Sequence, residues 1–155
     1  MNKEAKGIEL IIGYLGIFLM FVGAIVLVPL LVMAFYPEEA NELKCFLVPG
    51  TSSIAIGFFL YLFIQGKKKG KLENHEDLAL IVLVWVLAIV VSAIPFMLTG
   101  KYNFTQAIFE STSGYTTTGL SVVDVTTASH VFLFYRSFHF PRNFGDGNSL
   151  NYCFV

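Results

Sequence analysis

The stretch LIIGYLGIFLMFVGAIVLVPLLVMAFYP (residues 10–37) contains no Asp, Glu, Lys or Arg. Two more stretches without these charged residues follow, at residues 45–66 and 78–100. As α-helices they would reach roughly 42, 33 and 35 Å, against about 30 Å for the hydrocarbon core of a bilayer. Because backbone polar groups in lipid must be satisfied within the segment, each stretch is predicted to be a transmembrane helix. Pro29 is expected to kink the first one.

The composition supports an integral membrane protein. Hydrophobic residues make up 55% of the 155 and charged residues 14%, with a mean hydropathy of +0.70. Soluble domains have about 45–50% apolar and about 25% charged residues. Ten Lys and Arg against eleven Asp and Glu leave a net charge of −1, so no basic surface is available for nucleic acid. Cys45 and Cys153 form neither a disulfide framework nor a zinc spacing.

Two other interpretations of the apolar stretches fit less well. A cleaved signal peptide has an apolar core of about 7–15 residues and a small-x-small cleavage site, and the first stretch has neither feature. Buried core helices of a soluble protein would need a polar face, which all three stretches lack. Gly13, Gly16 and Gly23 in the first stretch permit close helix contact, either within the chain or in a dimer.

The charged connections predict the orientation in the membrane. Four lysines lie at residues 67–71, between the second and third stretches, and lysine near span ends stays on the cytoplasmic side. Residues 38–44 carry three glutamates and one lysine, which suits the outer side. Lys3 and Lys6 place the N-terminus inside. The chain is therefore expected to cross three times and to leave Lys101 outside.

A half-length helix is predicted after the third stretch. Asn103 can cap a helix, and Gln106 occupies the third helical position of a capping box. The helix is expected to cover residues 104–113, near 15 Å or half a bilayer, and to stop at Gly114. The residues that follow, YTTTGLSVV (115–123), are poor helix formers.

The Thr- and Gly-rich residues have two interpretations. Removing the hydration shell of a potassium ion requires replacement oxygens, which the backbone carbonyls of an extended segment can supply. Glycine allows the backbone angles that turn carbonyls inward, and threonine adds a hydroxyl. The half-length helix would direct its partly negative C-terminal end toward the ion. The alternative is a Thr-rich outer loop with β character.

One stretch, AIFESTSGYTTTGLSVV (107–123), resembles the first pore loop of the Trk/Ktr/HKT superfamily of potassium transporters. SAIPF (92–96) and LFYR (133–136) are also similar to segments of its TrkH branch. Two helices ahead of the pore unit favour TrkH over KtrB, whose usual form lacks them. The resemblance covers roughly residues 8–137.

The resemblance implies a mechanism and partners. Members carry four repeats of outer helix, pore helix, filter and inner helix around one pore in the inner (plasma) membrane, and they conduct potassium down its electrochemical gradient. They work as homodimers with a cytosolic nucleotide-binding regulatory subunit of the TrkA or KtrA type. Membrane lipid is the other partner, and nucleic acid is not one. Neither enzymatic catalysis nor a cofactor is expected, and no metal other than the transported potassium.

The resemblance also assigns site residues. The first filter segment would consist of Thr116, Thr117, Thr118, Gly119 and Leu120. Glycine at the fourth of these positions goes with potassium preference, whereas serine there accompanies sodium transport in some plant relatives. Glu110 on the pore helix either braces the filter from behind or faces the outer vestibule.

The predicted fold is therefore an all-α integral membrane protein with three transmembrane helices, a half-span pore helix, an extended filter loop and an incomplete inner helix. Its expected divisions are a two-helix membrane hairpin (1–72), a first pore repeat (73–137) and an aberrant tail (138–155). The inner helix should start near Ser129, but it carries Arg136 and a polar tail follows. A frameshift near residues 138–141 is one hypothesis for this tail.

Three functional interpretations stay open at this point. The first is potassium transport by the N-terminal part of a TrkH-like protein. The second is a truncated, non-transporting membrane fragment or an accessory protein that associates with a full-length subunit, because one filter segment cannot encircle an ion. The third is a sodium-permeable relative.

Overall fold

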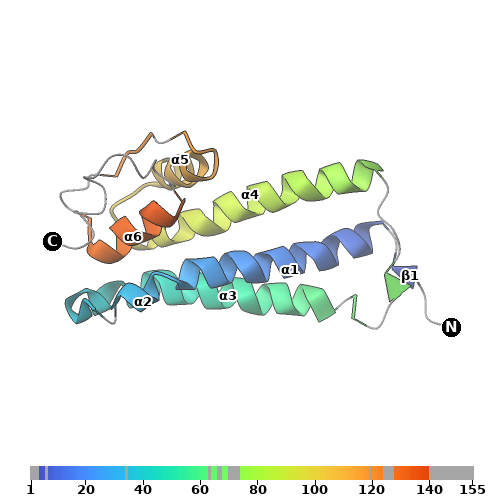
Figure 1. The fold of residues 1–155 in the computed structure, drawn as a ribbon, viewed down its shortest axis with the longest axis horizontal. Helices are drawn as coiled ribbons and strands as arrows, with labels where there is room; N and C mark the ends of the chain where they lie inside the picture. Colours follow the sequence, from blue (N-terminus) through green and yellow to red (C-terminus); the bar gives the residue numbers. More distant parts are fainter. Residues whose placement is uncertain are drawn as a thin grey trace.

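The computed structural model describes residues 4–5, 7–33, 35–62, 64–65, 68–69, 74–118, 120–123 and 128–139. Its elements, in chain order, are β1 (Glu4–Ala5), α1 (Ile8–Leu27), α2 (Leu30–Met33), the 3-10 helix η1 (Pro37–Glu42), α3 (Leu43–Leu62), β2 (Lys68–Lys69), α4 (Asn74–Leu98), α5 (Phe104–Tyr115) and α6 (His130–His139) (Figure 1). Gly119 and the predicted tail from residue 140 onward lie outside the described residues.

The prediction of three membrane-spanning helices is confirmed. Segments Ile8–Met33, Leu43–Leu62 and His75–Leu98 are long and apolar enough to cross a membrane. The first span is interrupted at the position of Pro29, because α1 ends at Leu27 and α2 begins at Leu30. Proline has no N–H to donate, so the helix cannot continue regularly through this position.

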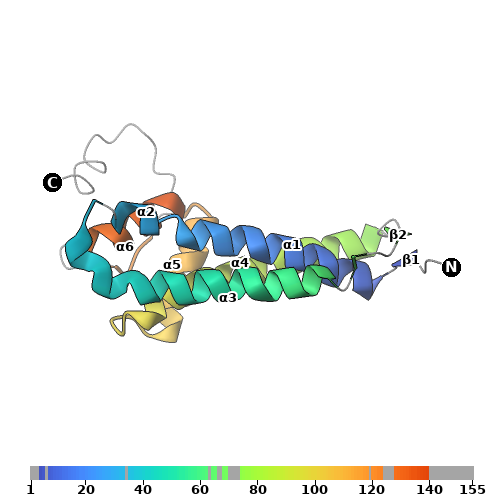
Figure 2. The ribbon, with the colours of Figure 1, turned by 90° about the horizontal axis from the view of Figure 1, so that it is seen from below.

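Helices α1 and α3 form an antiparallel hairpin that packs through glycines (Figure 2). A Cβ atom added to Gly16 would lie 2.7 Å from the carbonyl oxygen of Gly57. A Cβ atom at Gly23 would lie 2.8 Å from the carbonyl oxygen of Gly50. Both separations are too short for a real side chain, so the two backbones touch only because these positions are glycine. The α1 glycines thus make contacts within the chain.

The N-terminal residues and the lysine loop meet at one end of the bundle. Strand β1 pairs in parallel with β2, with Glu4 opposite Lys68 and Ala5 opposite Lys69. These two-residue strands are an addition to the predicted all-α fold. Figure 1 shows them at the end opposite α2, α5 and α6. The predicted topology likewise puts the N-terminus and the lysine loop on the same side.

Large apolar side chains cover the outer faces of the three long helices. The more exposed ones include Phe21 at 65%, Phe59 at 63% and Val82 at 62%. Water would penalise such a surface, whereas lipid tails would not. The exposed faces of α1, α3 and α4 are therefore suited to contact lipid.

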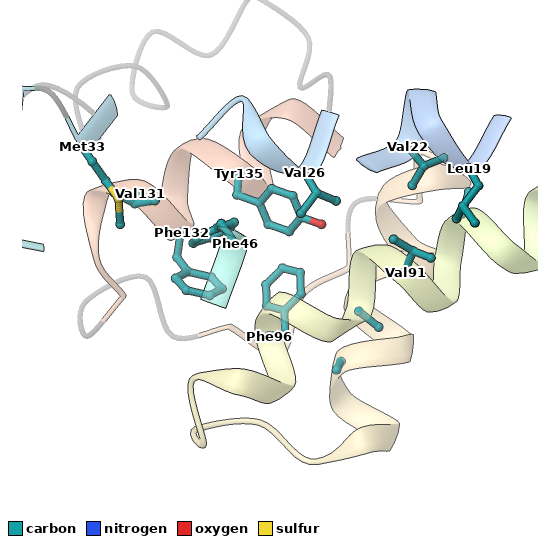
Figure 3. Packing of buried hydrophobic residues seen from close by; sticks show 13 residues of the cluster. Leu19, Val22, Val26, Met33, Phe46, Val91, Phe96, Val131, Phe132 and Tyr135 are labelled. Carbon is teal, nitrogen blue, oxygen red and sulfur yellow. The ribbon is translucent and has the colours of Figure 1, made fainter. Parts of the chain in front are cut away.

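An aromatic cluster holds α6 against the long helices (Figure 3). The ring of Phe46 on α3 lies 4.8 Å from Phe132 and 5.2 Å from Tyr135, both on α6. Phe96 on α4 lies 5.5 Å from each of these α6 rings. Tilted and edge-on pairs at such distances are favourable for aromatic rings. The cluster combines residues from before and after residue 72, the predicted boundary between the membrane hairpin and the first pore repeat. The division at that boundary stays a prediction.

Candidate functional site

Helix α5 begins as the sequence predicts. Asn103 is its N-cap, and Asn103 and Gln106 form a capping box. Oε1 of Gln106 accepts a hydrogen bond from the backbone N–H of Asn103 at 2.9 Å. The helix has 12 residues and a length of about 18 Å, slightly more than half of a bilayer core.

The end of α5 lies later than predicted. Gly114 is inside the helix, which runs to Tyr115, and the left-handed residue that ends it is Thr117, with a φ of 56°. The N–H of Thr117 donates to the carbonyl of Gly114 and the N–H of Thr118 to the carbonyl of Ser113, both at 3.1 Å. These two bonds form a Schellman motif. A β-branched residue rarely occupies its left-handed position, so the backbone is strained at Thr117.

The residues after α5 form the Thr-rich segment, residues 116–123, which contains neither helix nor strand from Thr118 onward in its described part. The side chains of Thr116, Thr117 and Thr118 are exposed. The hydroxyl of Thr116 donates to the carbonyl of Thr112 at 2.8 Å and lies 2.8 Å from the hydroxyl of Thr118. The predicted filter residue Gly119 is outside the described residues.

Leu120, the last of the predicted filter residues, is attached to α5. Its carbonyl oxygen accepts a hydrogen bond from the hydroxyl of Ser113 at 2.6 Å. This carbonyl is therefore turned back toward α5. Leu120 as a whole is 61% exposed. Ser113 lies seven residues earlier in the chain, a separation that matches no regular helix or strand contact.

Glu110 on α5 holds the backbone that follows Leu120. Its side chain is 1% exposed. Oε1 accepts a hydrogen bond from the hydroxyl of Ser121 at 2.8 Å, and Oε2 accepts one from the N–H of Val122 at 3.0 Å. Glu110 is thus buried and bonded to the backbone after the Thr-rich residues, and its role relative to a filter stays a prediction.

The buried charge of Glu110 is paired with a residue of α6. Nε of Arg136 donates to Oε1 of Glu110 at 3.1 Å, and the Arg136 side chain is 14% exposed. A buried carboxylate needs such partners, because desolvation without them is costly. Arg136, which from the sequence interrupts an apolar helix, thus has a definite partner in the fold.

Serine and tyrosine hydroxyls connect α4, α5 and α6 beside this pair. Ser92 on α4 is completely buried, and its hydroxyl lies 2.9 Å from the hydroxyl of Tyr115 on α5. The hydroxyl of Tyr135 on α6 donates to the backbone carbonyl of Ser92 at 2.9 Å. The three helices around the Thr-rich segment are therefore joined by directional bonds.

Comparison with known proteins finds several relatives of the chain. No family model matches the chain. It is 35% identical to the Trk system potassium uptake protein TrkH of Escherichia coli strain K12 over 134 residues, which are 84% of this chain and 26% of that protein. It is 34% identical to an uncharacterized cation transporter of Methanocaldococcus jannaschii over 135 residues, 86% of this chain and 27% of the relative. Over most of its own length, the chain is therefore a homologue of Trk potassium uptake proteins.

A second Trk protein of Escherichia coli strain K12, the potassium uptake protein TrkG, is 32% identical over 130 residues, covering 77% of this chain and 25% of TrkG. The part of the chain that aligns spans about a quarter of the length of the relatives it matches. All three relatives are named as transporters or uptake proteins, and none is named as an enzyme. With three helices long and apolar enough to cross a membrane, the chain itself is a multi-pass membrane protein.

The sequence contained no indication of several residues that hold the Thr-rich segment. Ser113, Ser121 and Arg136 were not assigned roles, because their partners are 7, 11 and 26 residues away and no pattern connects them. Among the described residues, no group of three or more His, Cys, Asp and Glu side chains could hold a metal ion.

Proposed function

We propose that this chain contributes one filter segment to a potassium pathway of the TrkH type. The observation that carries the proposal is the bracing of the Thr-rich segment by α5. Glu110 holds the residues at 121–122, and Ser113 holds the carbonyl of Leu120. Irregular backbone is tolerated at membrane depth only where it is buried in protein or lines a water-filled cavity.

In this proposal, Thr116, Thr117, Thr118 and Gly119 supply oxygens that replace the hydration shell of potassium. Leu120 fixes the end of the segment, because its carbonyl is bonded to Ser113. The backbone on both sides of Gly119 is bonded to α5, through the N–H groups of Thr117 and Thr118 and the carbonyl of Leu120, so little reorganisation should accompany each ion that enters. Potassium then passes down its electrochemical gradient.

A single segment cannot surround an ion, so the pathway needs further filter segments from other repeats or other chains. We propose that the working protein is a homodimer in the inner membrane, with a cytosolic regulatory subunit of the TrkA type. A cytoplasmic N-terminus is supported by the lysines near residue 68, where β1 pairs with β2. The Thr-rich segment would then lie toward the outer side.

A second candidate is a membrane fragment or accessory protein that does not transport by itself and associates with a full-length subunit. The specific observation in its favour is that the described residues offer one braced filter segment, while the aligned region covers only about a quarter of each matched relative. Copurification of this chain with a full-length Trk subunit, together with failure to support growth by itself, would favour this candidate.

Complementation of a potassium-uptake-deficient bacterium tests the proposal. The chain is expected to restore growth in low potassium, and Gly119→Asp is expected to abolish it, because a carboxylate side chain would enter the ion path. The matched control is Lys101→Asp, which adds the same side chain in the exposed loop ahead of α5 and should leave growth unchanged. Competition by sodium for rubidium uptake separates a potassium pathway from a sodium-permeable one. No growth with correctly inserted protein would contradict independent transport.

A further inference from the structure

The N-terminus of α6 is capped by a distant part of the chain. The N–H of His130 donates to Oε1 of Glu39 at 2.9 Å, and the N–H of Val131 donates to Oε2 of the same carboxylate at 3.0 Å. The hydroxyl of Ser129, the residue before the helix, accepts from the N–H of Phe132 at 3.4 Å. The first three N–H groups of α6, which have no partner inside the helix, are thereby satisfied. Glu39 lies in η1, 91 residues before His130.

More contacts attach η1 and its flank to the same point. Nδ1 of His130 donates to Oε1 of Glu39 at 2.8 Å. The His130 ring stacks on Tyr36, with 4.5 Å between ring centroids and an interplanar angle of 3°. The hydroxyl of Ser129 also donates to Glu42. Five side chains therefore form one cluster between the loop after α2 and the start of α6.

The carboxylate of Glu39 is suited to this position. Partial burial raises its pKa, but the hydrogen bonds from Val131 and His130 and the charge of the His130 ring outweigh this, and the pKa lies below its ordinary value. Glu39 is consequently ionised at neutral pH. A negative charge at a helix N-terminus is favoured by the helix dipole.

Helix α6 depends on such a cap because it is short. It has ten residues, and isolated helices below about 12–15 residues are marginal. The aromatic cluster holds its side in place but satisfies none of its terminal N–H groups. The same helix carries Arg136, which donates to Glu110, and Glu110 accepts the N–H of Val122. A continuous path of bonds therefore leads from Glu39 through α6 to the Thr-rich segment.

We propose that the η1 segment is a clasp, in which Glu39 positions α6 and thereby sets the backbone of the Thr-rich segment through Arg136 and Glu110. In this proposal the α1–α3 hairpin helps to position the filter unit, which consists of α5, the Thr-rich segment and α6. It does so because the loop that connects α1 and α3 determines where α6 begins. Glu39 acts as a positioning residue and does not touch the ion. The proposal concerns the chain's own fold, and it holds whether or not potassium passes.

Amide exchange in the full chain tests the clasp. The chain labelled with 15N-valine is placed in lipid nanodiscs, and NMR reports the exchange of Val131, which is bonded to Glu39, and of Val122, which is bonded to Glu110. Glu39→Gln is expected to speed exchange at Val131 about tenfold, as expected for loss of a helix cap, and at Val122 about threefold. Valines of α1, such as Val22 and Val26, should not change. The matched control Glu38→Gln removes the same charge from the exposed neighbouring residue and should change none of them.

The same substitution made in the Arg136→Met variant tests whether the effect of Glu39 on Val122 passes through Arg136. With Arg136→Met already present, Glu39→Gln should still speed exchange at Val131 but should have no further effect at Val122. Faster exchange at Val131 with an unchanged Val122 would overturn the proposal, as would an equal response to Glu38→Gln. If Glu39→Gln unfolds the chain, Ser129→Ala can be used instead, because it weakens the attachment of the α6 N-terminus less severely. It should again speed amide exchange at Val131 and, to a smaller extent, at Val122. A failed growth assay leaves these results unaffected, so the two proposals fail separately.

Discussion

The α1–α3 hairpin and the unit formed by α5, the Thr-rich segment and α6 are held together by different interactions. In the hairpin, glycines allow two helix backbones to touch, with Gly16 against Gly57 and Gly23 against Gly50. In the second unit, buried polar side chains bond to one another and to irregular backbone, above all Glu110 and Arg136.

The difference follows from what each region must hold. Two regular helices satisfy their own backbone groups, so in lipid they need only a close fit. An irregular segment leaves N–H and C=O groups outside any regular helix or sheet, so each buried one needs a partner from a side chain, another part of the backbone, water or an ion. The hairpin should accordingly respond to changes of side-chain volume, and the filter unit to the loss of single hydrogen bonds.

The largest expected effect is at Glu110. Glu110→Ala leaves Arg136 buried without its carboxylate and the N–H of Val122 without an acceptor, so we expect a loss of about 3–5 kcal/mol in the free energy of unfolding. Unfolding in mixed detergent and SDS micelles measures it. The double variant Glu110→Gln/Arg136→Met removes both charges and should lose much less. If the double variant is as unstable as Glu110→Ala, charge pairing is not what holds this unit.

A smaller effect is expected in the hairpin. A Cβ at Gly57 would lie 2.6 Å from the carbonyl oxygen of Gly16 and 2.9 Å from the N of Met20. Gly57→Val should therefore push α1 and α3 apart and cost about 1–3 kcal/mol by the same measurement. Ala55→Val, on the exposed face of α3, is the matched control and should be near neutral. Equal losses for the two variants would mean that the glycine contact is not specific.

The smallest effect is expected at the end of α5. Thr117 has a φ of 56°, where glycine has no steric penalty, so Thr117→Gly should raise stability by up to about 1 kcal/mol. Thr116, with a φ of −84°, has no such strain, and Thr116→Gly should lower stability. The pair is compared by thermal unfolding in detergent. Destabilisation by Thr117→Gly would show that its side chain, rather than its backbone, holds the turn.

Much of the fold was predictable because its causes are local. Uncharged stretches predicted the three spans, Pro29 predicted the break between α1 and α2, and Asn103 with Gln106 predicted the start of α5. The end of α5 was placed at Gly114, where glycine normally terminates helices. Thr117 takes that role instead, since Ser113 and Gly114 provide the carbonyls that complete its turn.

The apolar segments, the start of the half-span helix and the likeness to a filter can all be found in the amino-acid sequence. These properties depend on hydrophobicity and on residues within a few positions of each other. The folded chain is needed to see that Glu110 meets Arg136, that Ser113 turns the Leu120 carbonyl, and that Glu39 caps α6. Such pairs join residues far apart in the chain, and their bonds form only after the helices have packed and excluded water from between them.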